Sequence, residues 1–150
     1  MHQAESQLEA FLGRYLPGVA AIGRGAVRHL HARLPGCDAL VYDNYQALAV
    51  GFSPDGRTGS GILSIALYPR WVSLFFLQAT GLPDPGHLLQ GSGSTVRHIR
   101  LDSVDDLDSP QIRALIEAAV AAAKVPYDPA RAGQLVIKSV SAKQKPRRPD

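Results

Sequence analysis

Two apolar segments of strand length, residues 61–68 and 71–78, follow each other with only a Pro-Arg pair between them. In the first segment Leu63, Ile65 and Leu67 occupy alternate positions, and alternate side chains of a β-strand lie on the same face. That face is uniformly large and apolar, as expected for a strand that packs against a hydrophobic core. The two segments therefore predict the central strands of a sheet, joined as a hairpin.

The opposite face of these two strands carries Tyr68, Trp71, Ser73 and Phe75, a mixture of aromatic and small side chains. Helices on one side of the sheet would leave this second face open, and apolar patches of several hundred Å² are seldom left bare. The pattern therefore predicts that something lies on this face. The alternatives are the chain after Val125, a second subunit in a homodimer, or a ligand.

Apolar residues at helical spacing predict helices over residues 4–16 and 19–34. A third helix is expected with Ser109 as its N-cap and an end before Pro126. Gly23 lies inside the second helix, where glycine costs up to about 1 kcal/mol relative to alanine, so we expect it to permit close packing against another element.

Period-two patterns predict further strands at residues 37–45, 46–52 and 95–101. Residues 134–140 are also β-prone, and they either add an edge strand or lie across the open face. The order of elements predicts an α+β fold, a two-layer sandwich. Its antiparallel sheet is expected to have about five strands, with helices on one face.

A glycine-spaced loop at Gly91 and Gly93 leads directly into a strand that carries His98 and Arg100 on one face. Such a loop can direct several backbone N–H groups at one anion, and the two cationic side chains would then lie beside it. The alternative is a flexible hairpin connection into an edge strand. A short Gly-x-Gly with no following helix or lysine is a weak phosphate signal, which favours the hairpin.

The acidic run that includes Asp102, Asp105 and Asp106 precedes the third helix. It lacks the glycine and the terminal glutamate of an EF-hand calcium loop. Carboxylates are favoured near a helix N-terminus, so we interpret the run as helix capping.

Composition indicates one globular domain, because 45% of the 150 residues are hydrophobic and 19% are charged. We expect a single domain over residues 1–142 and a basic, disordered tail over residues 143–150. Five of the 16 Lys and Arg residues lie from Lys138 onward, so the net charge of +3 belongs to the end of the chain. This distribution argues against nucleic-acid binding except through the tail.

No segment approaches the roughly 18 to 20 apolar residues that cross a bilayer, and the N-terminus lacks the apolar core of a secretory signal. The single cysteine, Cys37, forms no internal disulfide and fits a small apolar role. We therefore expect a cytoplasmic protein that does not bind membranes. The spacing of residues along the sequence indicates no Ser/His/Asp, Cys/His or paired-carboxylate catalytic site, which favours a non-enzymatic role.

Five short motifs follow one another in a characteristic order: Val72–Phe76, Leu82–Pro85, Leu88–Gly93, Val96–Ile99 and Asp105–Asp108. In this order the chain resembles the YdhG-like family of small bacterial domains, most of them of unknown function, over approximately residues 8–123. Many members carry a lysine after the second glycine of the loop, where this chain has Ser94. The resemblance implies an antiparallel sheet backed by helices on one side, similar to frataxin, and one frataxin-like member is associated with intracellular iron delivery.

These features together predict a non-catalytic binding or accessory domain that needs no cofactor. Its open sheet face and Gly-rich loop are expected to accept a small anionic ligand or a protein partner. The expected ligand-binding residues are Tyr68, Trp71, Ser73, Phe75, Gly91, Gly93, His98 and Arg100. The alternative, implied by the resemblance, is a frataxin-like protein that binds and delivers iron through Asp102, Asp105 and Asp106.

Overall fold

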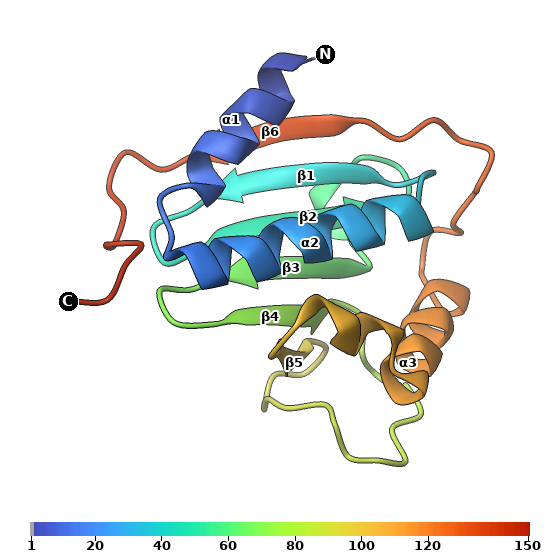
Figure 1. Ribbon diagram of the computed structural model, residues 1–150. Helices are drawn as coiled ribbons and strands as arrows, with labels where there is room; N and C mark the ends of the chain where they lie inside the picture. The colour runs from blue at the N-terminus through green and yellow to red at the C-terminus, as the bar shows by residue number, and fades with distance from the viewer. Residues whose placement is uncertain (1) are drawn as a thin grey trace.

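The computed structural model of the protein describes residues 2–150 and shows an α+β fold (Figure 1). Its main elements are α1 (His2–Leu12), α2 (Pro17–Arg33), β1 (Asp38–Asp43), β2 (Leu48–Ser53), β3 (Leu63–Leu67), β4 (Val72–Phe76), β5 (Arg97–Leu101), α3 (Pro110–Ala121) and β6 (Leu135–Val140). Two short 3-10 helices, η1 (Thr58–Ser60) and η2 (Val104–Asp108), lie in the connections. Within this part of the chain, no helix has both the length and the apolar character that crossing a membrane requires.

One sheet with the strand order β5-β4-β3-β2-β1-β6 forms the back layer, and α1, α2 and α3 lie on the same side of it (Figure 1). The expected α+β class is confirmed, but the sheet has six strands rather than about five. It is also mixed, because β6 pairs with β1 in parallel while the other neighbours are antiparallel. The sixth strand is β6, which the connection after α3 returns to the far edge of the sheet.

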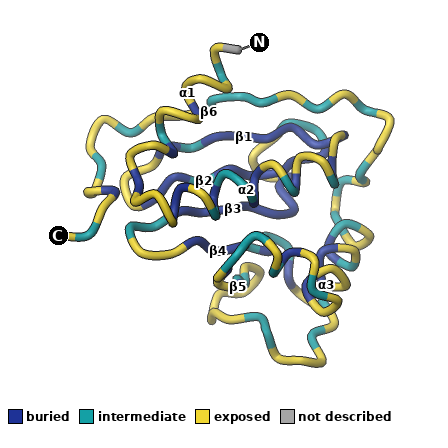
Figure 2. The backbone as a smooth tube through the Cα atoms, viewed as in Figure 1, coloured by how far each residue is buried: buried dark blue, intermediate teal, exposed yellow. Residues whose placement is uncertain are grey.

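The hydrophobic core lies between the helices and the large apolar face of the central strands (Figure 2). Leu63, Ile65 and Leu67 on β3 are fully buried there, as the alternation predicts. Burial of each such side chain contributes about 1.5–3 kcal/mol. Gly23 allows the close approach of α2, because a Cβ atom at this position would lie 2.5 Å from Cδ2 of Leu67.

The first helix ends at Leu12, four residues earlier than the pattern predicts. Tyr15 leaves the helix and turns into the core, where its hydroxyl donates to the carbonyl oxygen of Leu67 at 3.0 Å and accepts from the N–H of Leu48 at 3.1 Å. Pro17 then begins α2 at a position where its missing N–H costs nothing. The buried tyrosine thus ties the α1–α2 connection to two strands.

Two positions were predicted for residues 134–140, an edge strand or a segment across the open face, and the structure shows the edge strand. These residues form β6 beside β1, so they extend the sheet and do not lie across the open face. The ladder is irregular between Val41 and Tyr42, where the register with β6 shifts.

The C-terminal segment differs from the disordered tail that composition predicts. Arg147 is buried and donates to Asp43 at the end of β1, and the N–H of Lys145 donates to the carbonyl oxygen of Tyr45. Asp43 is itself buried, and a buried carboxylate requires a partner charge. The ion pair between Arg147 and Asp43 therefore keeps residues 143–150 packed against the domain.

Candidate functional site

The face of the sheet away from the helices, here called the open face, has a floor of small side chains at its centre. Ala49, Ala66 and Ser73 lie opposite one another on β2, β3 and β4, and Gly51 and Ser64 form the adjacent pair. Short side chains on three neighbouring strands leave the sheet surface lower here than on either side.

A shallow hollow of about 540 Å³ lies over part of this floor. Aromatic and apolar side chains border it, and the β1–β2 turn closes one end. We call this hollow the basin. It is lined by Asn44, Tyr45, Gln46, Ala47, Ala49, Ser64, Ala66, Tyr68, Phe75, Leu77 and Ser141.

Next to the basin, Tyr68 and Trp71 stack with their ring centroids 5.1 Å apart and an angle of 23° between the ring planes. The guanidinium carbon of Arg100 lies 4.9 Å from the centroid of the Trp71 ring, a cation–π distance. Trp71 is 36% exposed, so this group of a cation and two rings is open to solvent. Arg100 lies opposite Ser73 in the β4–β5 register, which places the cation beside the small floor.

Burial raises the pKa of Tyr68 above its ordinary value, so its hydroxyl stays protonated at neutral pH. The hydroxyl makes no hydrogen bond to any other residue in the described range 2–150. It can therefore donate a hydrogen bond to a molecule in the basin.

Phe75 and His98 extend the aromatic border onto the edge strand, with ring centroids 5.2 Å apart. They lie opposite each other in the β4–β5 register. The structure thus brings six of the eight expected ligand-binding residues together on the open face: Tyr68, Trp71, Ser73, Phe75, His98 and Arg100.

The two glycines are placed differently, in a hairpin turn at the edge of β5. Gly91 has a φ of 116°, and Gln90 and His98 exchange two backbone hydrogen bonds of 2.9 Å across the turn. The guanidinium of Arg97 donates to the carbonyl oxygens of Gly93 and Val96. The turn therefore directs carbonyl oxygens at a cation, which is the geometry of the hairpin alternative and not of a nest of N–H donors.

The acidic run forms the start of η2. One carboxylate oxygen of Asp106 accepts from the N–H groups of Asp102 and Ser103, and the hydroxyl of Ser103 accepts from the N–H of Asp105. This is a reciprocal capping box at η2, a 3-10 helix that the sequence does not predict, whereas the capping interpretation places the run at the start of α3, which Ser109 caps instead. Among the residues that the structure describes, no three His, Cys, Asp or Glu side chains are grouped as metal ligands would be.

Sequence reasoning missed the part of the basin contributed by β2 and the β1–β2 turn, namely Tyr45, Ala47 and Ala49. The signal for it was present, since Ala47 and Ala49 are small residues at alternate positions of a predicted strand. Their significance depends on the register with β3, which a single sequence does not provide.

No protein-family model matches the chain, and no curated protein and no solved structure matches it either. The resemblance to YdhG-like domains therefore stays a prediction.

Proposed function

We propose that this protein is a non-catalytic binding domain whose basin accepts a flat, anionic organic molecule. The observation that carries the proposal is the combination of a small-residue floor, aromatic borders and a stacked arginine on one sheet face. The order of its motifs supports a place among YdhG-like domains, and the single buried thiol, Cys37, supports a reducing, cytoplasmic location.

The shape of the basin favours a planar ligand. Ala49, Ser64 and Ala66 keep the floor low, and the rings of Tyr68 and Phe75 border it. A flat ring system can lie on such a floor and contact the side rings, whereas a bulky aliphatic group would stand clear of the surface. Most ligand sites combine apolar lining with a few placed polar groups. Here Tyr68 lines the basin and carries a hydroxyl, and the Arg100 guanidinium lies outside the lining, over Trp71.

The charge at the rim favours an anion. Arg100 is exposed and directed over Trp71, and it makes no hydrogen bond or ion pair with any residue of the described range. Its cation–π contact positions the guanidinium without neutralising it. A carboxylate or phosphate on the ligand would supply the missing counter-charge.

The hydrogen bonds of the described residues also support a binding role. Of the histidines whose side chains the structure describes, at positions 29, 31, 87 and 98, His29 bonds to Asp108, and none bonds to a serine hydroxyl or a cysteine thiol. A nucleophile needs such an activating base.

The test uses the single tryptophan, because its indole N–H gives one NMR signal that reports directly on the open face. Amide and indole shifts are followed during titration with 2-naphthoate at fixed ionic strength. Two matched compounds serve as comparisons: 2-naphthylmethylammonium reverses the charge, and cyclohexanecarboxylate removes the flat ring. We expect saturable shifts at Ala49, Ala66, Phe75 and Trp71 with naphthoate, and weaker binding of both comparison compounds.

Two variants test separately how the shape of the basin and the charge of Arg100 contribute to binding. Ala66→Leu fills the floor and is expected to abolish binding, while Arg100→Gln is expected to weaken it about tenfold through loss of one charged contact. Arg113→Gln, an exposed arginine on α3, serves as the matched control and should bind as the wild type does. Equal binding of all three compounds would overturn the proposal. Shifts that follow protein concentration instead of ligand concentration would also overturn it, because they would identify a second copy of the chain as the occupant.

A further inference from the structure

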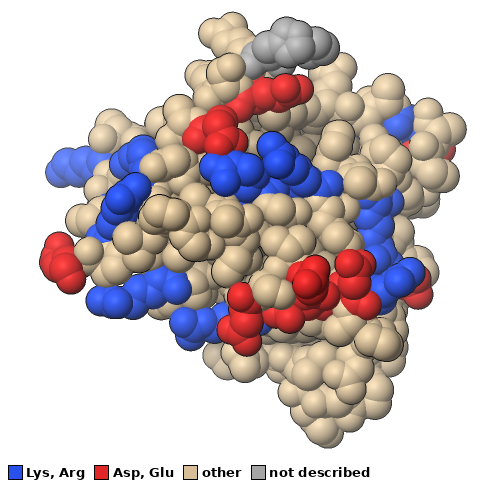
Figure 3. Space-filling model, viewed as in Figure 1, with Lys and Arg blue, Asp and Glu red and all other residues tan. Residues whose placement is uncertain are grey.

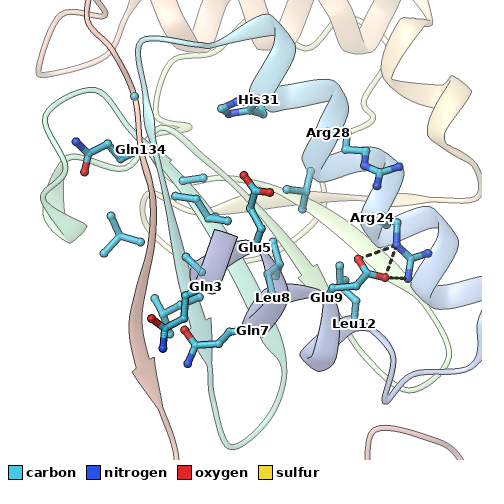
Figure 4. A pocket seen from close by; sticks show the side chains of 17 residues that line it. Gln3, Glu5, Gln7, Leu8, Glu9, Leu12, Arg24, Arg28, His31 and Gln134 are labelled. Atoms are coloured by element: carbon cyan, nitrogen blue, oxygen red, sulfur yellow. Dashed lines mark hydrogen bonds and ion pairs between the residues drawn. The ribbon is translucent and has the colours of Figure 1, made fainter. Parts of the chain in front are cut away.

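A second hollow, the α1 cleft, lies on the helix side of the sheet between α1, α2 and β6 (Figure 4). Its volume is about 910 Å³, within the general range of about 300–1,000 Å³ for small-molecule sites. The cleft exists because α1 packs mainly on β6 and diverges from α2.

The floor of the α1 cleft is apolar and comes from three elements. Leu8 and Leu12 on α1, Val27 on α2 and Leu135 and Ile137 on β6 line it. The two β6 side chains are only half-buried, so apolar surface remains at the bottom of the cleft. An apolar chain laid there would remove this surface from water, with a gain of about 25 cal/mol per Å².

One end of the cleft is closed by an ion pair between the two helices. The guanidinium Nε of Arg24 donates to both carboxylate oxygens of Glu9, at 2.9 Å and 3.1 Å. This hydrogen bond to Arg24 is the main reason that the pKa of Glu9 lies below its ordinary value. Glu9 is ionised at neutral pH, and Arg24 is its hydrogen-bond partner.

One helical turn further along α2, Arg28 borders the same cleft, and its charge also helps to lower the pKa of Glu9. Arg28 is exposed, and it makes no hydrogen bond or ion pair within residues 2–150. Figure 3 shows the resulting pattern, with acidic side chains over α1 and a basic band over α2 directly beside them. Glu5 also lines the cleft and has an interaction of its own, whereas the Arg28 guanidinium keeps its hydrogen-bond donors available for the head group of a ligand.

We propose that the α1 cleft binds an amphipathic carboxylate of fatty-acid type, with its apolar chain on the floor and its head group on Arg28. A guanidinium pairs with a carboxylate through two parallel hydrogen bonds, which fixes the head at the mouth of the cleft. His31 and Gln134 also line the cleft, from α2 and from the position just before β6 (Figure 4).

This site is independent of the basin. The α1 cleft lies on the helix side of the sheet, and Trp71 lies on the open face. A ligand in the cleft should leave the Trp71 indole signal unchanged, so failure of one proposal is distinguishable from failure of the other.

The experiment is an amide NMR titration of the full chain with decanoate below its micelle concentration. Decyltrimethylammonium provides the same chain with the opposite charge, and acetate provides the head group without the chain. We expect saturable shifts at Leu8, Val27 and Ile137 with decanoate, clearly weaker binding of decyltrimethylammonium and none of acetate.

Three variants test the roles proposed for Arg28 and for the interior of the cleft. Arg28→Gln is expected to weaken decanoate binding about tenfold, because one charge-assisted contact is lost. Ala4→Trp places a large side chain in the cleft from a half-buried position of α1 and is expected to abolish binding. Arg33→Gln, on the same helix but outside the cleft, is the matched control and should leave the affinity unchanged.

Three results would overturn the proposal. They are an absence of saturable shifts at the cleft, equal binding by the Arg28→Gln and wild-type proteins, and decanoate shifts that extend to Trp71 on the open face.

Discussion

Arg147 and Asp43 form an ion pair in the interior, with 2.9 Å between Nη2 and Oδ1, although 104 residues separate them. Both side chains are only 2% exposed. Gln144 also donates to Asp43, at 2.9 Å, and Arg147 donates to the carbonyl oxygen of Asn44. The last ten residues are thus fastened to the end of β1 by a buried charge.

Replacement of Arg147 by alanine should therefore destabilise the whole domain. Loss of one partner of a buried ion pair costs about 3–5 kcal/mol, and we expect the lower end here because Asp43 keeps Gln144 at 2.9 Å and Arg14 at 3.4 Å. Arg148→Ala is the matched control: Arg148 is exposed and donates only to backbone carbonyls of Gly13 and Arg14, so we expect a change within about 1 kcal/mol. Urea unfolding followed by circular dichroism measures both variants. Equal losses in the two variants would show that the ion pair does not hold the tail.

This ion pair is also an example of a contact that a single sequence does not predict. Within the basic run 143–148, nothing distinguishes Arg147 from its solvated neighbours, since the cause of its burial is a carboxylate at the far end of the chain. The prediction of a disordered tail followed local composition and missed that distant partner.

The alternation of apolar residues, in contrast, was sufficient to predict the central strands of the sheet. The alternation in residues 63–67 predicts both the buried face of β3 and the aromatic open face beside it, because a strand fixes which side chains share a side. The role of Gly23 in close helix packing was also predictable, since glycine inside a helix needs a compensating reason. The basin depends on register between strands and the α1 cleft on the angle between helices, and neither is encoded in a local pattern.

A second prediction concerns acid stability and Asp38. The side-chain hydrogen bond from Arg131, followed by that from the N–H of Gln134, lowers the pKa of Asp38 below its ordinary value of 3.8. A lowered folded-state pKa gives stability that is present above the unfolded pKa and is lost as the pH falls through the folded pKa. Wild-type stability should therefore decline below about pH 4, and Asp38→Asn should decline less steeply.

The measurement is the urea midpoint at intervals from pH 2 to pH 7. At neutral pH we expect Asp38→Asn to lose about 1–3 kcal/mol, because the Arg131 guanidinium loses its charged acceptor. Asp102→Asn, whose exposed carboxylate is not part of the capping box, should reproduce the wild-type curve. Parallel curves for wild type and Asp38→Asn would contradict the assignment.

A third prediction concerns alkaline stability and Cys37. Burial raises the pKa of this thiol from 9.0 to about 11. A raised folded-state pKa gives stability that is complete below the unfolded pKa and is lost as the pH rises through the folded pKa. We therefore expect wild-type stability to fall between about pH 9 and 11 by on the order of 2 kcal/mol more than that of Cys37→Ala. Tyr15 also has a pKa raised by burial, but it is common to both proteins, so the difference between them isolates the thiol.

Reactivity provides an independent check on the thiol. At pH 8 the folded protein should resist iodoacetamide and react only after unfolding in urea, because the thiolate is the nucleophile and the thiol is fully buried. Rapid alkylation of the folded protein at this pH would contradict the raised pKa.

The last prediction concerns Gly133, where the chain crosses the start of β1 before it enters β6. The N–H of Gly133 donates to the carbonyl oxygen of Pro35 at 3.0 Å, and a Cβ atom at position 133 would lie 2.0 Å from the carbonyl oxygen of Cys37. Two backbone segments must separate to admit even one methyl group. Gly133→Ala should therefore cost about 3 kcal/mol, the upper end of overpacking effects.

Gly59→Ala, which would meet no atom within 4 Å, is the matched control and should be nearly neutral. Amide shifts in Gly133→Ala should concentrate in β6 and β1, since these strands lose their alignment first. If Gly133→Ala instead unfolds at the wild-type urea concentration, the crossing of the two backbone segments is looser than the distances indicate.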